Sequence, residues 1–417
     1  MNRSQVIEAI TKAVDPHSEN HKRALKEALR LDREPLARLL FEHSLAAPVA
    51  EVLKHQPEFP EGGRFVIHRD NGWSGLDADS VAAALVKRVG AGESPTDAVS
   101  WLERVLTRKK GEGLCVLAVW GVSVRDKISF DNGVELLPIE ELPDSSLKAH
   151  AMRRRDFGDL VDLVSMPFLR APEAALTYRL TLEPVISDHR LGTPPIREDQ
   201  LREYELLTDV LLALTAVGPR APLHAGYWFQ YLDRDLHDAL FHVGKTLSFP
   251  EILPTGFFPP SVLDPEAAKQ IVSQYLRLKP GLHRKVQVAL QRLNQATHRS
   301  RFGDKAAELS IALEALLVDD PGENTHKVGL RASLLLGGTS QERIRNRAII
   351  GGIYSARSAL IHGGAKSAEI RLKEIGPLPS QAVAEEGVGI CAAVIRRILE
   401  LGEIPSWYGF ELGPDGG

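Results

Sequence analysis

The sequence predicts an α+β protein that is predominantly α, with helices towards both ends of the chain and a β-rich region between them. Apolar residues recur at helical spacing over residues 3–56, 77–108 and 264–401. Residues 114–137 and 176–185 instead carry the continuous or alternating apolar runs that are typical of strands. We therefore expect an N-terminal helical region (1–110), a β-rich middle region with a sensing or regulatory role (111–257), a C-terminal helical domain (258–405) and a tail (406–417).

The composition is that of a soluble globular protein. The 417 residues are 43% apolar and 25% charged, and their net charge of −4 gives no overall attraction to nucleic acid or membrane. Any polyanion site must therefore be local. Two cysteines, Cys115 and Cys391, are too few for a thiolate metal site, and no apolar run is long enough to span a bilayer. We expect a reduced, cytoplasmic protein with no metal, no cofactor and no membrane partner.

Local signals place two helices in the N-terminal region. A helix is expected from about Asp77, and Ser94-Pro95 supplies an N-cap and a first-turn proline for a second helix that ends near Arg108. From residue 113 the apolar period changes. Residues 114–120, 122–130 and 134–137 are interpreted as a β-meander, and Leu176–Val185 as a further strand. A helix is expected from Glu198 to about Ala216, and residues 219–260 are left unassigned.

From Asp264 the sequence is helical again, and it is locally basic. No acidic residue lies between Glu266 and Asp304, and Pro280 divides this interval into two helices. Five of its basic residues are candidates for RNA binding: Arg284, Lys285, Arg292, Arg299 and Arg301. The alternative, given equal weight, is a solvated helix face paired with acidic residues elsewhere. A last helix is expected over residues 380–401.

One stretch carries the chemistry, residues 354–364, with the sequence Tyr-Ser-Ala-Arg-Ser-Ala-Leu-Ile-His-Gly-Gly. Thr339 and Glu342 form a capping box that predicts a helix from Ser340 into this stretch. Arg357 is a fixed cation suited to phosphate, and His362 near the helix end can exchange protons at neutral pH. The spacing of these two residues is by itself weak evidence for a catalytic pair, because an exposed arginine and a histidine that caps a helix would show the same spacing.

The order of three segments is more specific. Residues 304–317 read D-K-A-A-E-L-S-I-A-L-E-A-L-L, a second helix includes Leu330–Leu336, and the arginine-histidine stretch follows. This order resembles the HEPN superfamily, and within it the Apea-like HEPN proteins, over about residues 258–402. By position, Arg357 and His362 match the catalytic pair of that family, and Ser358 matches its polar residue after the arginine. Asp304 and Glu314 match family positions that we interpret as supporting groups, with simple helix ion pairs as the alternative.

The resemblance implies a homodimeric, metal-independent endoribonuclease with a composite site at the dimer interface. It also implies a role in prokaryotic antiviral defence by abortive infection, with cellular RNA, such as tRNA, as substrate. The trigger is unknown, and a phage component and a partner protein are its candidates. Tyr354 is a candidate for stacking on a base, and core packing is its alternative role. A second hypothesis is a non-catalytic HEPN dimer that acts as an RNA-binding or scaffold module.

Overall fold

The computed structural model describes residues 1–14, 45–60, 64–70, 72–153, 171–188, 202–218, 220–240, 260–319, 322, 324–361 and 368–412. His362 lies outside these ranges, as do residues 15–44 of the helical stretch expected over 3–56 and residues 198–201 of the helix expected from Glu198. Of the described residues, 58% are helical and 18% lie in strands, with helices towards both ends and a strand-rich middle. The predicted α+β class, predominantly α, is confirmed. The chain divides into two compact units, residues 1–116, 178–203 and 228–246 in one and the remainder in the other.

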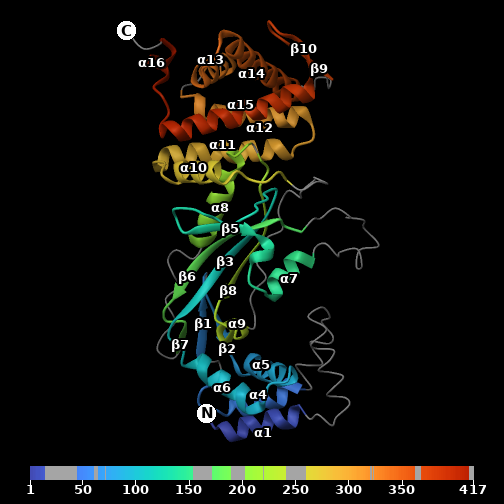
Figure 1. Cartoon of the computed structure of the whole chain (residues 1–417), viewed down its shortest axis with the longest axis vertical. Coiled ribbons are helices and arrows are strands. Elements are labelled where there is room, and N and C mark those ends of the chain that lie inside the picture. The colour runs from blue at the N-terminus through green and yellow to red at the C-terminus, as the bar shows by residue number, and fades with distance from the viewer. Residues whose placement is uncertain are drawn as a thin grey trace. The chain divides into compact units, whose positions relative to one another are not determined.

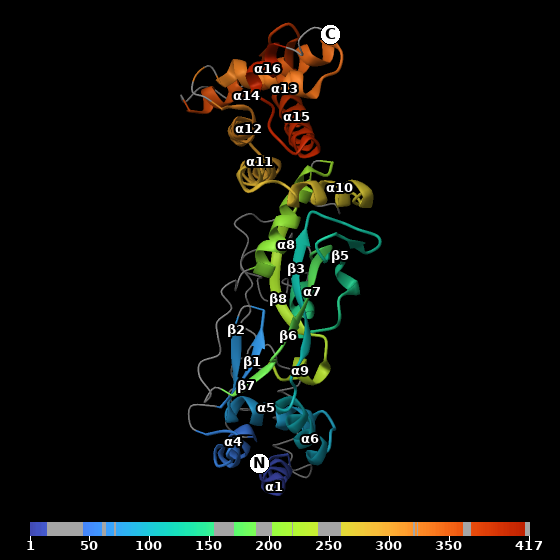
Figure 2. The ribbon, with the colours of Figure 1, turned by 90° about the vertical axis from the view of Figure 1, so that its left-hand side faces the viewer.

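The first unit contains short helices and a small antiparallel sheet (Figures 1 and 2). Asp77 caps α5 and Ser94 caps α6, with Pro95 in its first turn, as the sequence predicted. Strand β1 lies between β2 and β7, and Phe65 of β1 is paired with Leu76 of β2. The helices are α1 (Arg3–Ala13), α4 (Ala47–Lys54), α5 (Ala78–Gly90), α6 (Pro95–Leu106) and α9 (Arg234–Asp238), and the strands β1 (Phe65–Arg69), β2 (Gly72–Leu76) and β7 (Ile186–Asp188).

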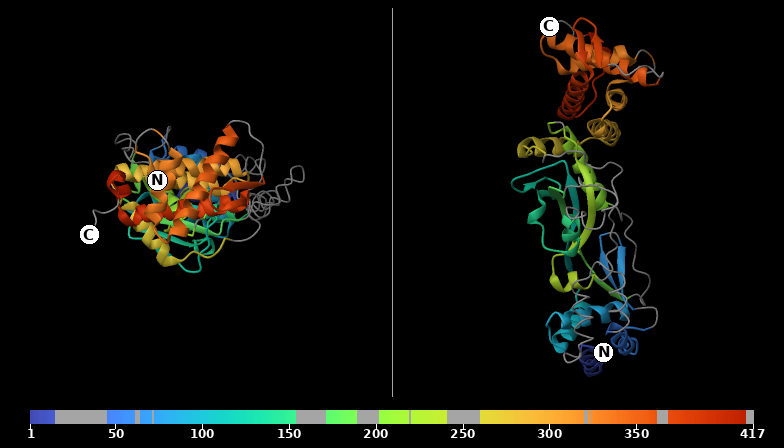
Figure 3. Two further views of the ribbon diagram at one scale, coloured as in Figure 1. Left: turned by 90° about the horizontal axis from the view of Figure 1, so that it is seen from above. Right: turned by 90° about the vertical axis from the view of Figure 1, so that its right-hand side faces the viewer.

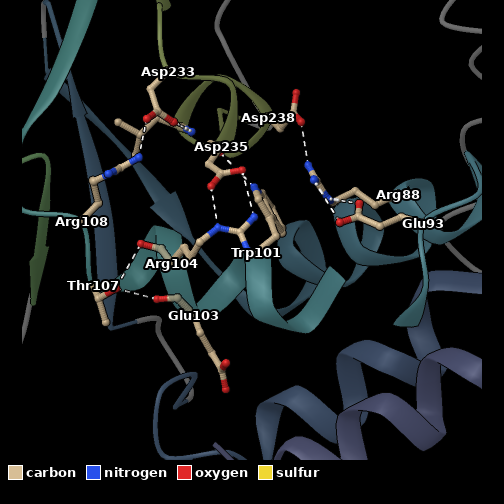
Figure 4. Close-up of polar contacts among 11 residues, drawn as sticks. Arg88, Glu93, Trp101, Glu103, Arg104, Thr107, Arg108, Asp233, Asp235 and Asp238 are labelled. Atoms are coloured by element: carbon tan, nitrogen blue, oxygen red, sulfur yellow. Dashed lines mark hydrogen bonds and ion pairs between the residues drawn. The ribbon is translucent and has the colours of Figure 1, made fainter. Parts of the chain in front are cut away.

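Three arginines of α5, α6 and the residues just after α6 each bind one aspartate of the segment 233–238 (Figure 4). Arg104 Nε lies 2.8 Å from Asp235 Oδ2, Arg88 Nη1 lies 2.6 Å from Asp238 Oδ2, and Arg108 binds Asp233. The Trp101 indole N–H also donates to the Asp235 carbonyl at 3.1 Å. These contacts, with the fully buried Leu236, fix α9 against α6.

A five-stranded sheet has the strand order β4-β5-β6-β3-β8. The predicted strands at 114–120, 134–137 and 176–185 are present, but the predicted meander is wrong in its first link. Strand β3 pairs with β6 and β8 rather than with β4, and β4 spans two residues. The unassigned stretch contains β8. The strands are β3 (Gly111–Trp120), β4 (Ile128–Ser129), β5 (Val134–Pro138), β6 (Ala174–Leu182) and β8 (Leu223–Tyr231), with α7 (Ser146–Arg153) and a 3-10 turn (Ile139–Glu141) between β5 and β6.

The second unit contains a helical bundle built around α12, which packs on α11, α13, α14 and α15 (Figures 1 and 3). Leu309, Leu313 and Leu317 of α12 are fully buried there. Pro280 opens α11 and so separates it from α10, as predicted. The helices are α8 (Arg202–Ala213), continued by a 3-10 turn (Leu214–Ala216), α10 (Pro265–Leu276), α11 (Pro280–His298), α12 (Phe302–Leu317), α13 (Asn324–Leu336), α14 (Ser340–Ile361), α15 (Ser380–Leu401) and α16 (Trp407–Leu412).

Two further features complete the bundle. A hairpin that the sequence did not reveal, β9 (Glu369–Leu372) with β10 (Gly376–Pro379), packs on α14. The buried Arg331 of α13 holds α16, because its Nε donates to Glu411 at 2.6 Å and its Cζ lies 5.2 Å from the centroid of the Trp407 ring. No helix in the described part of the chain has the length and apolar character needed to cross a bilayer.

Candidate functional site

The predicted arginine lies on helix α14, which is fixed by a capping box at its start and by buried apolar residues along its length. Glu342 accepts from the Thr339 backbone N–H at 2.7 Å and the Thr339 hydroxyl at 2.8 Å, while the Glu342 N–H donates to Thr339 Oγ1 at 3.3 Å. This is the predicted capping box. Ile349 and Ile353 are fully buried and anchor the helix in the bundle. Arg357 follows one turn after Ile353.

Glu314 of α12 joins two of the predicted residues of α14. Its Oε1 accepts from Arg357 Nη1 at 2.7 Å and from the Tyr354 hydroxyl at 2.9 Å. The Arg357 Cζ also lies 5.9 Å from the centroid of the Tyr354 ring. The Arg357 and Glu314 side chains are 29% and 22% exposed. The guanidinium is therefore oriented by its neighbours yet remains accessible to solvent.

Tyr354 contributes to this arrangement as a hydrogen-bond donor. Burial, followed by the charge of Glu314 and the hydrogen bond to it, raises the pKa of the phenol well above its usual range. The hydroxyl therefore stays protonated and cannot act as a base near neutral pH. The residue is only 9% exposed, so the structure gives it the packing role, and its ring offers little free surface to a base.

The remaining residues of the predicted catalytic and supporting sets differ in position. Ser358 is exposed on α14, next to Arg357. Asp304 lies in the first turn of α12, where a carboxylate interacts favourably with the helix dipole. It is ten residues from Glu314 on the same helix, about 15 Å along the axis, so the two acids do not share one cluster. His362 lies outside the described residues.

The five predicted RNA-binding residues of the basic interval fall into two groups. Arg292 and Arg299 both bind Glu308, through Arg292 Nη1 to Oε2 at 3.1 Å and Arg299 Nη2 to Oε1 at 3.0 Å. Arg284, Lys285 and Arg301 are exposed. For Arg292 and Arg299 the structure thus gives the alternative weighed above, a basic helix face paired with an acidic residue elsewhere.

Sequence reasoning missed Glu308, which is only 8% exposed. A signal for it was present in the helical period. Glu308 precedes Ala312 and Leu316 at intervals of four residues, on the apolar face of α12. A carboxylate on a buried helix face requires a partner, and two arginines from the end of α11 and the residue after it supply one.

Among the residues that the structure describes, no group of three or more His, Cys, Asp or Glu side chains is placed to hold a metal ion. Comparison with known proteins finds no match for this chain among family models, curated proteins or solved structures.

Proposed function

We propose that this protein is a metal-independent endoribonuclease whose centre contains Arg357, Ser358 and His362, as the resemblance to HEPN proteins implies. The observation that carries the proposal is the anchoring of Arg357. A guanidinium held by Glu314 at 2.7 Å and left 29% exposed is pre-oriented and open to a phosphate.

The chemistry begins with attack of an RNA 2′-hydroxyl on the adjacent phosphorus, which releases the 5′-oxygen of the next nucleotide and leaves a 2′,3′-cyclic phosphate. One imidazole removes the proton of the hydroxyl and another protonates the leaving oxygen. Arginine stabilises the charge of the pentacoordinate phosphate but cannot act as the base. One chain supplies one such arginine-histidine pair, so the active form is a homodimer in which two copies of residues 354–364 face each other.

The test compares RNA cleavage by the wild type, Arg357→Ala and His362→Ala in the presence of EDTA. His362→Ala lowers the rate by at least about a hundredfold, since a proton-transfer group contributes about 10² to 10⁴. Arg357→Ala lowers it by about 10² to 10³, the loss expected when one group that stabilises transition-state charge is removed. Arg345→Ala is the matched control. It removes an arginine of the same helix that is ion-paired with Glu386, and it leaves cleavage unchanged. Equal cleavage by all variants refutes the site, and complete loss of wild-type activity in EDTA refutes the metal-free mechanism.

Glu314 serves this centre as a positioning residue. Glu314→Gln keeps the shape but removes the charge that orients Arg357, so it lowers kcat and leaves KM nearly unchanged. Tyr354→Phe removes only the hydroxyl that donates to the same oxygen, and its effect is smaller. If Glu314→Gln raises KM alone, the residue contributes to binding and does not position Arg357 for the reaction.

A specific observation favours the second function, a non-catalytic HEPN dimer that binds RNA or acts as a scaffold. The charge of Arg357 is already balanced by Glu314, as expected of a purely structural ion pair. The two functions are distinguished by incubating the dimer with RNA. Binding without cleavage by the wild type, unchanged in His362→Ala, supports the module and excludes the nuclease.

The biological setting that we propose is the prokaryotic cytoplasm, with cellular RNA such as tRNA as substrate in abortive infection. Expression of the wild type in a bacterial host together with a phage then arrests growth and fragments RNA, and His362→Ala does neither. Identical growth and intact RNA in both strains exclude this setting. A phage component or a partner protein is the proposed trigger.

A further inference from the structure

The first turn of α12 lies against the last turn of α14. A Cβ at Gly303 would lie 3.3 Å from both Cβ and Cδ1 of Leu360, so the two helices approach closely at a position without a side chain. Further along α12, Glu314 binds Tyr354, which lies more than one turn before Leu360. The two helices therefore run antiparallel, and the start of α12 is placed beside the part of α14 that carries Arg357.

The surface that joins these two helix ends is exposed. The three residues after Arg357, numbers 358–360, are all exposed, and 47% of Leu360 is accessible to solvent. On the α12 side, Arg301 is exposed at the residue before the helix begins. An RNA strand bound at Arg357 therefore reaches the start of α12 without crossing a buried segment of either helix.

Arg301 is the N-cap residue of α12, but only its backbone acts as a cap. Its carbonyl accepts the Lys305 N–H at 3.1 Å, while its side chain makes no capping hydrogen bond. Two residues span at most about 7 Å, so the Cα of Arg301 lies within that distance of the Cα of Gly303, which contacts Leu360. The guanidinium group is thus held close to the end of α14 and is not used by the helix itself.

The charge of Arg301 is not compensated by a carboxylate of the described residues, unlike that of its neighbour Arg299. Arg299 lies two residues earlier and binds Glu308 at 3.0 Å. Asp304 is the acidic residue closest to Arg301 in sequence, but it lies in the first turn of α12, where the helix dipole stabilises its charge, and forms no ion pair with Arg301. Arg301 is therefore an unpaired cation beside the proposed centre.

We infer that Arg301 binds the RNA phosphate next to the one that is cleaved at Arg357. A guanidinium offers a planar fork of donors that matches two oxygens of a phosphate. The inference rests on the proposed function and deepens it, because it names the substrate class, RNA with at least two consecutive phosphates. Arg301 is a substrate-binding residue in this account and takes no part in proton transfer.

The first test measures RNA binding by the full-length His362→Ala protein, so that cleavage does not interfere. Fluorescence anisotropy follows a labelled single-stranded RNA of about 12 nucleotides, comparable with the site of one single-strand-binding domain. Adding Arg301→Gln weakens binding about two- to fivefold, as for the loss of one exposed ion pair, and lowers the salt slope by about 0.7. Arg301→Lys keeps the charge and therefore keeps the salt slope.

Arg299→Gln is the matched control, because it removes an arginine two residues away whose partner is Glu308. It leaves the salt slope unchanged. An equal decrease of the slope in Arg301→Gln and Arg299→Gln, or no decrease in either, overturns the inference.

A second test locates the phosphate that Arg301 binds. In RNAs that carry one neutral methylphosphonate linkage, placed either directly before or directly after the cleaved phosphate, one of the two linkages raises KM of the wild type. Arg301→Gln shows no further increase of KM with that RNA, because the contact is already lost. Independent, additive increases of KM at both positions overturn the inference.

A third measurement separates this inference from the proposed nuclease. Arg301→Gln lowers kcat/KM for the long RNA about two- to fivefold more than for a dinucleotide, which has no second phosphate. If the wild type cleaves no RNA but the binding difference between Arg301→Gln and Arg299→Gln persists, the phosphate contact stands and the nuclease falls. If cleavage depends on Arg357 and Arg301→Gln cleaves the long RNA as the wild type does, the nuclease stands and the inference falls.

Discussion

Arginines recur on helices, or just after them, in both units, but their surroundings differ. In the first unit Arg88, Arg104 and Arg108 each bind their own aspartate of the segment 233–238 (Figure 4). On α14 of the second unit, Arg343 and Arg347 have no carboxylate partner among the described residues. The first set neutralises itself and fixes a short helix, whereas the second leaves positive charge exposed.

The difference shows why a run of basic residues does not by itself predict nucleic-acid binding. Arg104 and Asp235 are separated by 131 residues in the sequence, and Arg345 and Glu386 by 41. No local pattern announces such partners. Exposed arginines without a carboxylate are therefore candidates for binding an external anion, and paired ones contribute to stability. Arg357 combines both features, since it is paired with Glu314 and remains 29% exposed. A series of substitutions tests this division.

The largest loss of stability is expected for Arg331→Ala. The Arg331 side chain is only 6% exposed, and it binds Asp319, Glu411 and the Leu317 carbonyl. Its removal leaves these acceptors without their donor and costs about 3 kcal/mol of unfolding free energy. The shift of the urea midpoint of the second unit measures it. If Arg331→Ala lowered the unfolding free energy by less than the substitutions at Glu308 and Asp235 described next, burial of an ion pair would not determine its contribution to stability.

A smaller loss is expected for Glu308→Gln. The carboxylate is 10% exposed and accepts from two arginines that are themselves 41% and 47% exposed. Because solvent screens the arginines, the substitution costs about 1–2 kcal/mol, measured by the same urea transition. An unchanged midpoint would mean that Arg292 and Arg299 are free to bind RNA, as the sequence allowed.

A still smaller effect is expected for Asp235→Asn in the first unit, about 0.2–1 kcal/mol, because Arg104 is 55% exposed. The hydrogen bond from Arg104 lowers the pKa of the Asp235 carboxyl. A carboxyl whose pKa is lower in the folded than in the unfolded protein stabilises the folded state at pH values above its unfolded pKa of about 3.9. This stabilisation is lost as the pH falls through the pKa that the carboxyl has in the folded protein. The difference in unfolding free energy between the two proteins therefore shrinks as the pH falls below about 4 and disappears only below the folded pKa. A difference that grows on acidification would contradict this sign.

The smallest effect on stability is expected for Arg343→Gln, within about 0.5 kcal/mol of the wild type, because the residue is exposed and unpaired within the described part. The same urea titration measures it. A loss comparable to that of Glu308→Gln would show that Arg343 has a structural partner.

What the sequence predicted correctly depends on short-range physics. The caps of α5, α6 and α14 need only residues within one turn, and the apolar period determined the ends of α15. The pairing of β3 with β6 and β8 failed because strand neighbours are set by contacts across the chain. The β9-β10 hairpin was missed since its turn places Glu374 at a φ of 67° without the usual asparagine or glycine signal there.

The residues of the candidate site could be predicted from short-range patterns, but the contacts between them could not. Arg357 and Tyr354 could be named from their motif, and Glu314 from its place in the family order. The contact that joins them, through one oxygen of Glu314, spans 43 and 40 residues and depends on how α12 packs on α14. Glu308 was missed because its role depends on its burial, and no sequence motif indicates that burial.

The most direct test of the central claim is cleavage of an RNA in which one nucleotide, at the mapped cleavage position, lacks its 2′-hydroxyl. If Arg357 and His362 act on RNA as proposed, the wild type leaves that bond intact, while the all-ribose RNA is cut there to give a 2′,3′-cyclic phosphate and a 5′-hydroxyl. Cleavage of the deoxy-substituted bond at an unchanged rate, or failure to cleave either RNA, would contradict the account.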